Sequence, residues 1–378
     1  MNLRAPLGLY VHIPFCSVKC FYCDFVAFSG KSGQTDRYLD SLEREAACYD
    51  GVFPDTLYVG GGTPSELSAE QITRLLSILS DQFGPVSGWR ETTFEVNPES
   101  AEEGKFEALR SGGVGRISIG LQTPDDSLLK SIGRKHDYAQ FVKTYLAARK
   151  TGHALSVDLM CALPGQSVKN FKSGLDKVLQ LEPEHISLYA LSVEDRTLFM
   201  KRAVIPDEDS GREMLEAAYE RLERAGFEQY EISNFARPGH ASAHNENYWR
   251  NGSCVGLGCG AAGHLSGVRY QNEDVLARYT AKADAGVRPL ADEERLTGKE
   301  KIGESIWLGL RRLEGLVLSP EMQSLFRREI EALTERGLLR LRGGCSDSLP
   351  KLSLTRSGVF LANEVFREFI APFEGAEL

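Results

Sequence analysis

Three cysteines, Cys16, Cys20 and Cys23, follow one another at C-x3-C-x2-C spacing directly after a short apolar segment. Iron–sulfur clusters are usually bound by four cysteine thiolates. Three closely spaced cysteines can bind three irons of a [4Fe-4S] cubane and leave the fourth iron open to another ligand. The spacing therefore predicts a cluster that activates a bound molecule rather than one that only carries electrons.

Two other kinds of site also use closely spaced cysteines. Cys20 and Cys23 alone would fit a thioredoxin-like redox pair or half of a zinc site, but a structural zinc site normally needs two such pairs. The remaining cysteines are scattered, and Cys254 and Cys259 have poor zinc spacing; these remaining residues are Cys48, Cys161, Cys254, Cys259 and Cys345. The cluster is favoured, and a structural zinc protein stays as an alternative.

The bulk composition is that of a globular protein of 378 residues with 42% hydrophobic and 26% charged residues. A formal net charge of -9 argues against nucleic acid as the main partner, because a phosphate backbone requires clustered Lys and Arg. Sparse cysteines fit a reducing compartment. Residues 1–6 are too short for a signal peptide, and no apolar run is long enough to span a membrane. We expect a cytoplasmic protein without a transmembrane segment.

Short β-rich segments alternate with helical periodicity over the first half of the chain. The predicted strands are Leu7–Ile13, Thr56–Val59, Thr92–Val96, Arg116–Leu121, Ala154–Leu159 and His185–Ala190. The predicted helices are Asp36–Tyr49, Ala69–Phe83, Ala101–Ser111, Tyr138–Lys150 and Lys169–Leu181. This alternation predicts an α/β fold with a parallel sheet, either doubly wound or a partial (β/α) barrel.

Unusual polar residues recur where the predicted strands end. In α/β barrels the chemistry lies on the loops at the carboxyl ends of the strands. The strand ends in question are the cysteine loop, Gly60–Pro64, Glu95–Pro98, Gln122, Asp158 and Tyr189–Ala190. Because these ends would share one rim, we expect them to bind one ligand together.

The pattern changes beyond residue 191. The predicted elements are a helix at Ser210–Ala225, a strand at Tyr230–Asn234, an aromatic loop up to Trp249, a glycine-rich segment at Val255–Gly263, charged helix-favouring sequence from near Tyr270, and helices at Leu296–Leu310, Pro320–Arg336 and Ser357–Phe369. Leu338–Leu341 and Lys351–Leu354, separated by polar Gly343–Asp347, predict a winged hairpin. We therefore expect a barrel (1–235), a loop segment (236–270) and a small, mostly helical, winged-helix-like domain (271–378).

With these motifs, the chain resembles the radical S-adenosylmethionine (SAM) superfamily from about Leu7 to its end. Within it, the chain resembles the branch of oxygen-independent coproporphyrinogen III oxidase and the HemW group of haem chaperones. The resemblance implies a partial (β/α)6 TIM-type barrel. It also implies that Cys16, Cys20 and Cys23 bind a [4Fe-4S] cluster whose open iron chelates SAM. An electron donor would reduce the cluster, and one electron would cleave the sulfonium.

The resemblance further implies two SAM sites. Tyr10, Gly61 and Glu95 would contact the first SAM. The second SAM would be contacted by the Tyr22 backbone, Gly62, Thr63, Gln122, Arg134, Asp158 and Ala190. An ionised Asp158 would accept hydrogen bonds from the ribose, and Arg134 would face a carboxylate.

Two departures separate the chain from the oxidase. That enzyme carries another cysteine where this chain has Phe25, and it has an N-terminal extension that is missing here. Conversely, the run from His244 to Trp249 resembles the His-Asn-x-x-Tyr-Trp signature of the haem-chaperone group. One position differs from the group's usual pattern, because Ala262 replaces a histidine and His264 follows two places later.

The resemblance therefore implies a haem chaperone that binds haem as cargo and delivers it to an unidentified haem-requiring protein. His244 would be the axial ligand, with Tyr248 and Trp249 against the porphyrin. A histidine in an aromatic loop is, on its own, more often a packing residue. The alternative is an enzyme, an oxygen-independent oxidase that uses radical chemistry to decarboxylate propionates of coproporphyrinogen III oxidatively, which yields protoporphyrinogen IX. The residues leave open whether the protein is an enzyme.

Overall fold

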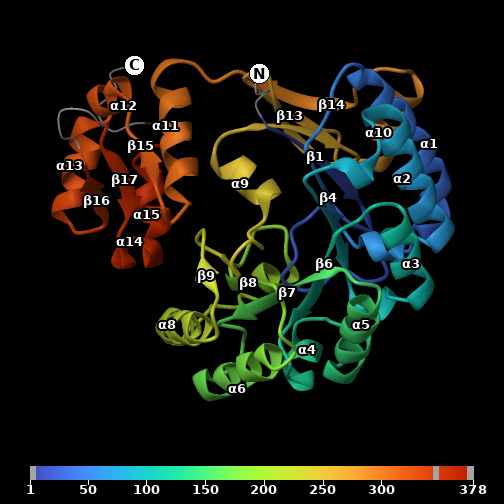
Figure 1. Ribbon diagram of the computed structural model, residues 1–378, viewed down its shortest axis with the longest axis horizontal. Coiled ribbons are helices and arrows are strands. Elements are labelled where there is room, and N and C mark those ends of the chain that lie inside the picture. Colours follow the sequence, from blue (N-terminus) through green and yellow to red (C-terminus); the bar gives the residue numbers. More distant parts are fainter. Residues whose placement is uncertain (1–5, 344–348, 373–378) are drawn as a thin grey trace.

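A curved twelve-stranded sheet dominates the computed structural model, which describes residues 6–343 and 349–372 (Figure 1). Six strands run parallel in the order β1-β4-β5-β6-β7-β8. Their bounds are β1 (Leu7–Ile13), β4 (Thr56–Gly61), β5 (Glu91–Val96), β6 (Arg116–Gln122), β7 (Ala154–Cys161) and β8 (His185–Ala190). The predicted parallel sheet is thus confirmed, and each predicted strand overlaps an observed one.

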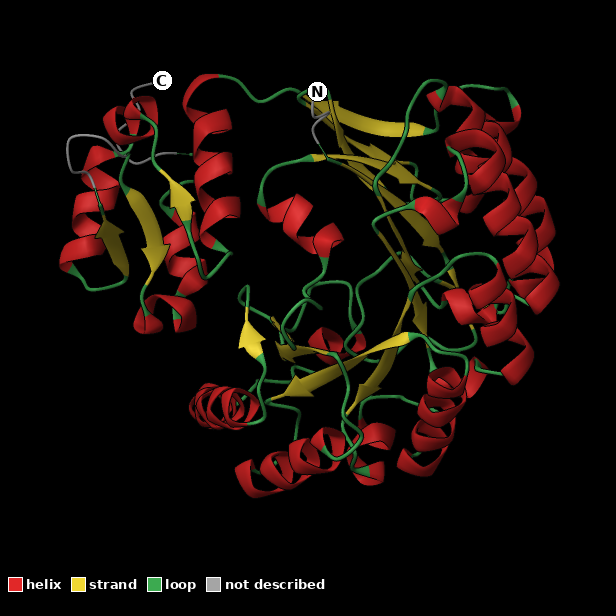
Figure 2. Cartoon of the chain, viewed as in Figure 1, coloured by secondary structure: helices red, strands yellow, loops and turns green. Residues whose placement is uncertain are grey.

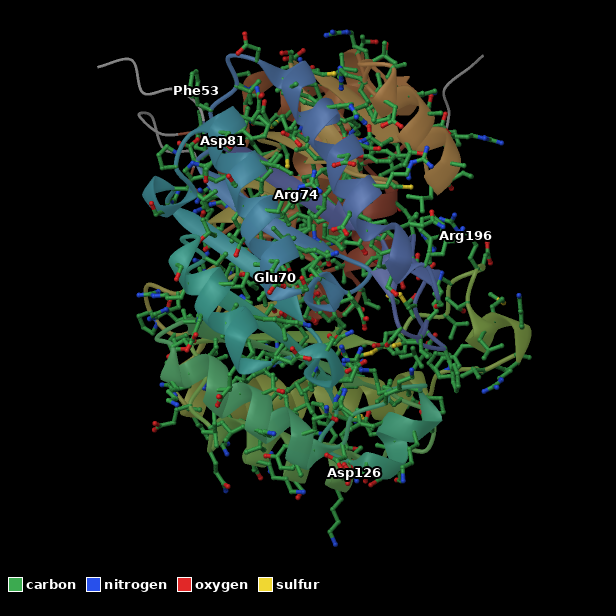
Figure 3. All side chains as sticks on the ribbon, turned by 90° about the vertical axis from the view of Figure 1, so that its right-hand side faces the viewer. Phe53, Glu70, Arg74, Asp81, Asp126 and Arg196 are labelled. Carbon is green, nitrogen blue, oxygen red and sulfur yellow. The ribbon has the colours of Figure 1, made fainter. Side chains whose placement is uncertain are left out.

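Helices cover the outer face of this sheet, as Figure 2 shows. They are α1 (Thr35–Ala46), α2 (Ala69–Phe83), α3 (Glu103–Ser111), α4 (Asp126–Ser131), α5 (Tyr138–Lys150), α6 (Val168–Leu179) and α8 (Glu208–Arg224). On α2, Glu70, Arg74 and Asp81 lie on the outer surface, whereas Ile72 and Leu79 are buried (Figure 3). This amphipathic pattern is typical of a helix packed on a sheet. Together, strands and helices form the expected partial barrel.

Successive side chains along each parallel strand alternate between the two faces of the sheet. The outward group is apolar and buried: Leu9, Val11, Leu57, Val59, Phe94, Ile117, Ile119 and Val157. The inward group, which surrounds the hollow of the barrel, is largely polar: Tyr10, Tyr58, Glu95, Ser118 and Asp158. The inner face of the sheet therefore presents polar side chains that can bind a ligand, whereas its outer face packs against the helices.

The sheet extends past the six strands at both edges. β11 (Ser253–Leu257) pairs parallel to β1, and β12 (Ala262–Leu265), β13 (Val268–Asn272) and β14 (Leu290–Glu294) follow antiparallel, with α10 (Leu276–Asp284) between the last two. The glycine-rich segment was predicted without strands, and this was wrong. A Cβ at Gly256 would collide with the Ala262 carbonyl, so glycine is what allows these strands to approach closely.

At the other edge, β10 (Asn234–Ala236) pairs antiparallel with β8 and with β9 (Glu228–Gln229). The predicted strand at Tyr230–Asn234 was misplaced, because most of it lies between β9 and β10. Its backbone bonds elsewhere: the Ile232 N–H donates to the Arg311 carbonyl, and the Leu313 N–H donates to the Tyr230 carbonyl. These bonds join the barrel to the carboxyl-terminal unit.

The aromatic loop contains a short helix, α9 (Ala243–Trp249), on the concave side of the sheet (Figure 1). Ser242 caps it by accepting a hydrogen bond from the Asn245 N–H. The Glu91 carboxylate, from the start of β5, accepts hydrogen bonds from the N–H groups of Ala243 and His244. Since that second cap comes from a distant strand, the local sequence did not reveal the helix.

The carboxyl-terminal unit packs a small sheet, in the order β15-β17-β16, among helices. Its elements are α11 (Gly298–Leu310), β15 (Leu316–Val317), α12 (Pro320–Leu325), α13 (Arg327–Glu335), β16 (Leu339–Arg342), β17 (Lys351–Leu354), α14 (Arg356–Phe360) and α15 (Ala362–Arg367). Two predicted helices are each broken into two, at Phe326 and at Leu361. Most of the predicted polar segment 343–347, including Cys345, lies outside the described residues.

The predicted division of the chain at residues 235 and 270 stays a prediction. In the structure, the main sheet contains strands on both sides of these two positions, and its last strand in sequence ends at Glu294.

Candidate functional site

The three predicted cluster cysteines lie on the loop after β1. Cys16 ends the short strand β2 (Phe15–Cys16), which pairs with β3 (Phe28–Ser29). The loop is fixed at its centre, because the Phe21 N–H donates to the Ile132 carbonyl at 3.0 Å, and the Phe21 carbonyl accepts from Phe199, at the start of α7 (Leu198–Lys201), at 3.0 Å. All three thiols are free and partly exposed.

A cavity of about 300 Å³ opens at the carboxyl ends of the strands beside this loop. The predicted residues that line it are Cys16, Cys20, Tyr22, Cys23, Gly61, Gly62, Thr63, Glu95, Gln122, Arg134 and Asp158. Two predicted SAM residues do not line the cavity. The Tyr10 ring stacks on that of the lining residue Tyr58, with ring centroids 6.3 Å apart, and the exposed Ala190 follows the lining residue Tyr189 in the sequence. The structure thus brings together residues that are far apart in sequence.

The glycine turn after β4 lets the backbone approach its neighbours closely. Gly61 has a φ of +110°, and a Cβ there would lie 2.6 Å from the His12 ring. A Cβ at Gly62 would lie 3.1 Å from the Cys16 sulfur and 2.9 Å from two backbone carbonyls. Only glycine therefore fits at these two positions beside the cysteine loop.

Glu95 is a half-buried carboxyl group at the cavity. It accepts hydrogen bonds from the Tyr58 hydroxyl at 2.6 Å and from the Gly61 N–H at 3.3 Å. Burial raises the pKa of Glu95 to about 7, and the Tyr58 hydrogen bond opposes the rise. Burial also raises the pKa of Asp158, which accepts a hydrogen bond from Ser118 at 3.1 Å. The cavity thus holds two carboxyl groups that titrate above their usual range.

A polar network connects two of the cysteines. Thr63 Oγ1 lies 3.2 Å from the Cys16 sulfur and accepts a hydrogen bond from Asn97 Nδ2 at 3.1 Å. Arg134 Nη2 donates to Asn97 Oδ1 at 2.8 Å, and Arg134 Nη1 lies 3.7 Å from the Cys20 sulfur. The Arg134 guanidinium thus links Asn97 to the sulfur of Cys20.

Several lining residues were not predicted as site residues: Tyr58, Asn97, Ser118 and Tyr189. Asn97 and Tyr189 stand at strand ends that the sequence had marked. For Tyr58 and Ser118 the available signal was the alternation along the strand, in which a polar residue lies between two apolar ones.

The donor set fits an iron–sulfur cluster. Burial raises the pKa of Cys16 to about 11 and also raises that of Cys23, so binding metal would release protons from these thiols. Among the described residues, no three His, Cys, Asp or Glu side chains converge on a point as a single metal ion would require. The cysteine ligands of a cubane bind different irons, so they need to surround a cavity rather than to converge.

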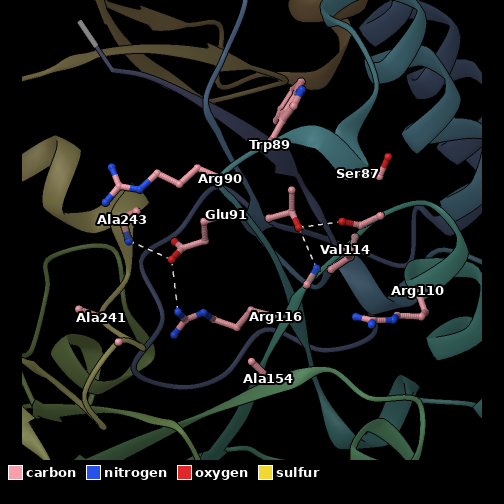
Figure 4. A pocket seen from close by; sticks show the side chains of 14 residues that line it. Ser87, Trp89, Arg90, Glu91, Arg110, Val114, Arg116, Ala154, Ala241 and Ala243 are labelled. Atoms are coloured by element: carbon pink, nitrogen blue, oxygen red, sulfur yellow. Dashed lines mark hydrogen bonds and ion pairs between the residues drawn. The ribbon is translucent and has the colours of Figure 1, made fainter. Parts of the chain in front are cut away.

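The predicted haem motif lies at the opposite end of the barrel. There, Glu91 accepts from α9 and pairs with Arg116 at 3.3 Å, beside a cavity of about 610 Å³ (Figure 4). This cavity is larger than the one at the cysteines, but only the smaller cavity contains the predicted cluster and SAM residues. The Glu91 contacts hold α9 at the amino-terminal ends of the strands.

His244 is buried with both ring nitrogens in hydrogen bonds. Nδ1 lies 2.8 Å from Thr56 Oγ1, and Nε2 lies 3.0 Å from the Tyr248 hydroxyl. Burial lowers the pKa of His244 to about 4, so the ring is neutral at pH 7. Trp249 faces the other way, toward the carboxyl-terminal unit, and the Arg311 guanidinium lies 4.2 Å from its ring centroid. The three motif residues therefore do not share one surface.

The position at which the sequence departs from the haem-chaperone pattern, Ala262 in place of a histidine, lies on β12. Ala262 is exposed, and His264 is half-buried and pairs in register with Cys254.

Comparison with known proteins places this arrangement in a family. The radical SAM superfamily model matches residues 10–178. The heme chaperone HemW of Lactococcus lactis is 36% identical over 97% of this chain and 98% of its own length. The chain belongs to the HemW family. HemW of Bacillus subtilis is also 36% identical, over 96% of this chain and 98% of that protein.

Among solved structures, the HemW-family chain is similar to coproporphyrinogen III oxidase (HemN) from Escherichia coli, a radical SAM enzyme. The TM-score is 0.83 at 25% identity, covering 97% of this chain and 90% of that one. The radical SAM fold implies a [4Fe-4S] cluster and SAM as cofactors. No helix within residues 6–343 and 349–372 is long and apolar enough to cross a membrane.

Proposed function

We propose that this protein is a haem chaperone that binds a [4Fe-4S] cluster and SAM, accepts haem and passes it to a haem-requiring protein. The observation that carries the proposal is the similarity to heme chaperones HemW at 36% identity over nearly the whole length of both chains. The cavity at the carboxyl ends of the strands adds the cofactor-binding part of the proposal. The haem acceptor and the electron donor are further proteins, and a cytoplasmic location stays a prediction.

In this proposal Cys16, Cys20 and Cys23 hold the cluster, which would supply one electron to the sulfonium of SAM. Glu95, with Tyr10 and Gly61 beside it, binds the first SAM. The Glu95 carboxyl titrates near pH 7 and sits against the Gly61 N–H, so its charge at the cavity depends on pH.

A second SAM would use the other predicted residues of the rim, among them Thr63, Arg134 and Asp158. Arg134 is buried and already bonds to Asn97 and the Gly120 carbonyl. It therefore orients the network beside Cys20. Asp158, held by Ser118, faces the cavity as a hydrogen-bond acceptor for hydroxyl groups.

The second candidate function is coproporphyrinogen III oxidation, favoured by the similarity to the E. coli oxidase. Phe25 argues against it. This residue stands where the oxidase branch has another cysteine, and it is a 59% exposed side chain at the mouth of the cavity.

Haem titration of the reconstituted full-length protein tests the proposal. A chaperone should show a saturable Soret band at about one haem per chain, as for a single haem site. Absence of saturable haem binding would contradict the proposal.

A further inference from the structure

A groove separates the carboxyl-terminal end of α9 from the carboxyl-terminal unit. It encloses about 390 Å³, within the range of roughly 300–1,000 Å³ typical of small-molecule sites. One wall is formed by Trp249 and Arg250, and the other includes Leu316, Val317 and Met322. The groove is therefore lined both by Trp249, the last residue of the haem motif, and by residues of the carboxyl-terminal unit.

The groove offers apolar surface. Val317 is 56% exposed, although it lies on a strand of the small sheet, and the half-buried Trp249 lines the same groove. The Arg311 guanidinium lies over the Trp249 ring, 4.2 Å from its centroid. The indole Nε1 of Trp249 is buried without a hydrogen-bond partner among the described residues. An aromatic side chain and an exposed apolar side chain in the same groove suit a planar aromatic ligand.

The charges at the groove favour a ligand with carboxylates. The lining holds three cations, Arg250, Arg312 and Lys351, and one acid, Glu314. Glu314 is about half exposed; it pairs with Arg312 and lies 3.7 Å from Lys351 Nζ. Arg250 pairs with Glu246 at 3.3 Å. The Arg312 side chain is largely buried, but those of Arg250 and Lys351 are more than 40% exposed. Since exposed ion pairs contribute little, a ligand carboxylate can replace the partners of Arg250 and Lys351.

We propose that this groove binds the cargo haem, with the porphyrin face between Trp249 and Val317 and the propionates at Arg250 and Lys351. The inference deepens the proposed function and rests on it. The protein would then recognise the porphyrin ring and the propionates of haem, and binding would not require the iron. It also does not require His244, whose two nitrogens are already bonded inside the barrel.

The test uses the full-length, cluster-reconstituted protein, titrated with haem and separately with metal-free protoporphyrin IX. In Val317→Asp a charge enters the apolar wall, which should weaken both ligands roughly tenfold or more. Lys351→Glu reverses a charge at the rim and should weaken both roughly threefold to tenfold. The matched controls are Leu341→Asp and Arg340→Glu, exposed on β16 of the same small sheet, and they should bind as the wild type does.

The outcomes separate this inference from the proposed function. If the wild type binds haem and both groove variants bind it as tightly as the wild type, the groove is not the haem site and the chaperone proposal stands. Haem binding without binding of metal-free protoporphyrin IX would overturn recognition through ring and propionates. If the wild type binds no haem, the proposed function fails as well. Because Val317 and Lys351 are solvent-exposed, unchanged melting curves should show that their variants remain folded.

Discussion

The two ends of the barrel differ in what surrounds a titratable side chain with a shifted pKa. At the carboxyl end, Glu95 is half-buried, has a pKa of about 7 and borders a cavity. At the amino-terminal end, His244 is buried with a pKa of about 4, and protein groups bond to both its ring nitrogens. Burial shifts both pKa values, but only Glu95 is open to a ligand. A shifted pKa therefore indicates a binding group only where a cavity adjoins it.

The largest expected effect is on the cluster, at the carboxyl end. Changing Cys20 to Ala should abolish the cluster, because three thiolates are needed to hold it. Iron and sulfide analysis after anaerobic reconstitution should fall from about four of each per chain to near zero. Cys161→Ala, which changes a buried thiol in β7, should keep the full content. A Cys20→Ala protein with full iron content would show that these cysteines are not the ligands.

The next effect concerns the glycine turn. Gly61→Ala should cost about 1–2 kcal/mol for the positive φ and a further 1–3 kcal/mol for the collision with His12. Gly84→Ala is the matched control, because Gly84 has a φ of +90° but open space around its Cβ. Urea unfolding should show a larger loss for Gly61→Ala. Equal losses would mean that close approach at Gly61 is unimportant.

Glu95 should make SAM affinity depend on pH. The carboxyl is neutral below its pKa of about 7 and charged above it, so binding of the cationic sulfonium should strengthen as pH rises through 7. The change in the EPR signal of the reduced cluster on SAM addition measures this affinity. Glu95→Gln should remove the pH dependence, whereas Glu70→Gln, on the outer surface of α2, should retain it. A pH-independent wild type would contradict the role given to Glu95.

In the absence of SAM, the Glu95 carboxyl should make the folded protein less stable as pH rises, whereas SAM binding strengthens as pH rises. The folded state favours the protonated form, because burial raises the pKa from 4.5. The resulting stabilisation is fully present below pH 4.5 and is lost as pH rises through about 7. Urea unfolding of wild type and Glu95→Gln at several pH values should show this difference; parallel pH curves would exclude it.

The smallest effect is at the amino-terminal end. His244→Phe leaves Thr56 and Tyr248 without their ring partner and should cost about 1–3 kcal/mol of unfolding free energy. Tyr248→Phe removes one hydroxyl and should cost less, about 1 kcal/mol. Urea unfolding measures both, and haem affinity should change little. A His244→Phe protein of normal stability that no longer binds haem would support the ligand role predicted from the motif.

The contrast between the ends also explains what the sequence could predict. The cysteine spacing, the glycine turn and the strand-end residues are local patterns, and the parallel sheet brings them to one rim. The position of α9 depends on Glu91, which is far from it in the chain. The burial of His244 likewise depends on Thr56 and Tyr58 of β4. These long-range contacts have no local signature, so the motif was recognisable but its surroundings were not.

One measurement tests the chaperone assignment most directly. The reconstituted protein is incubated anaerobically with coproporphyrinogen III, SAM and a reductant, and a parallel sample receives haem. The account predicts stable haem binding in the second sample and no protoporphyrinogen in the first. Accumulation of protoporphyrinogen together with a failure to bind haem would contradict it and establish the oxidase.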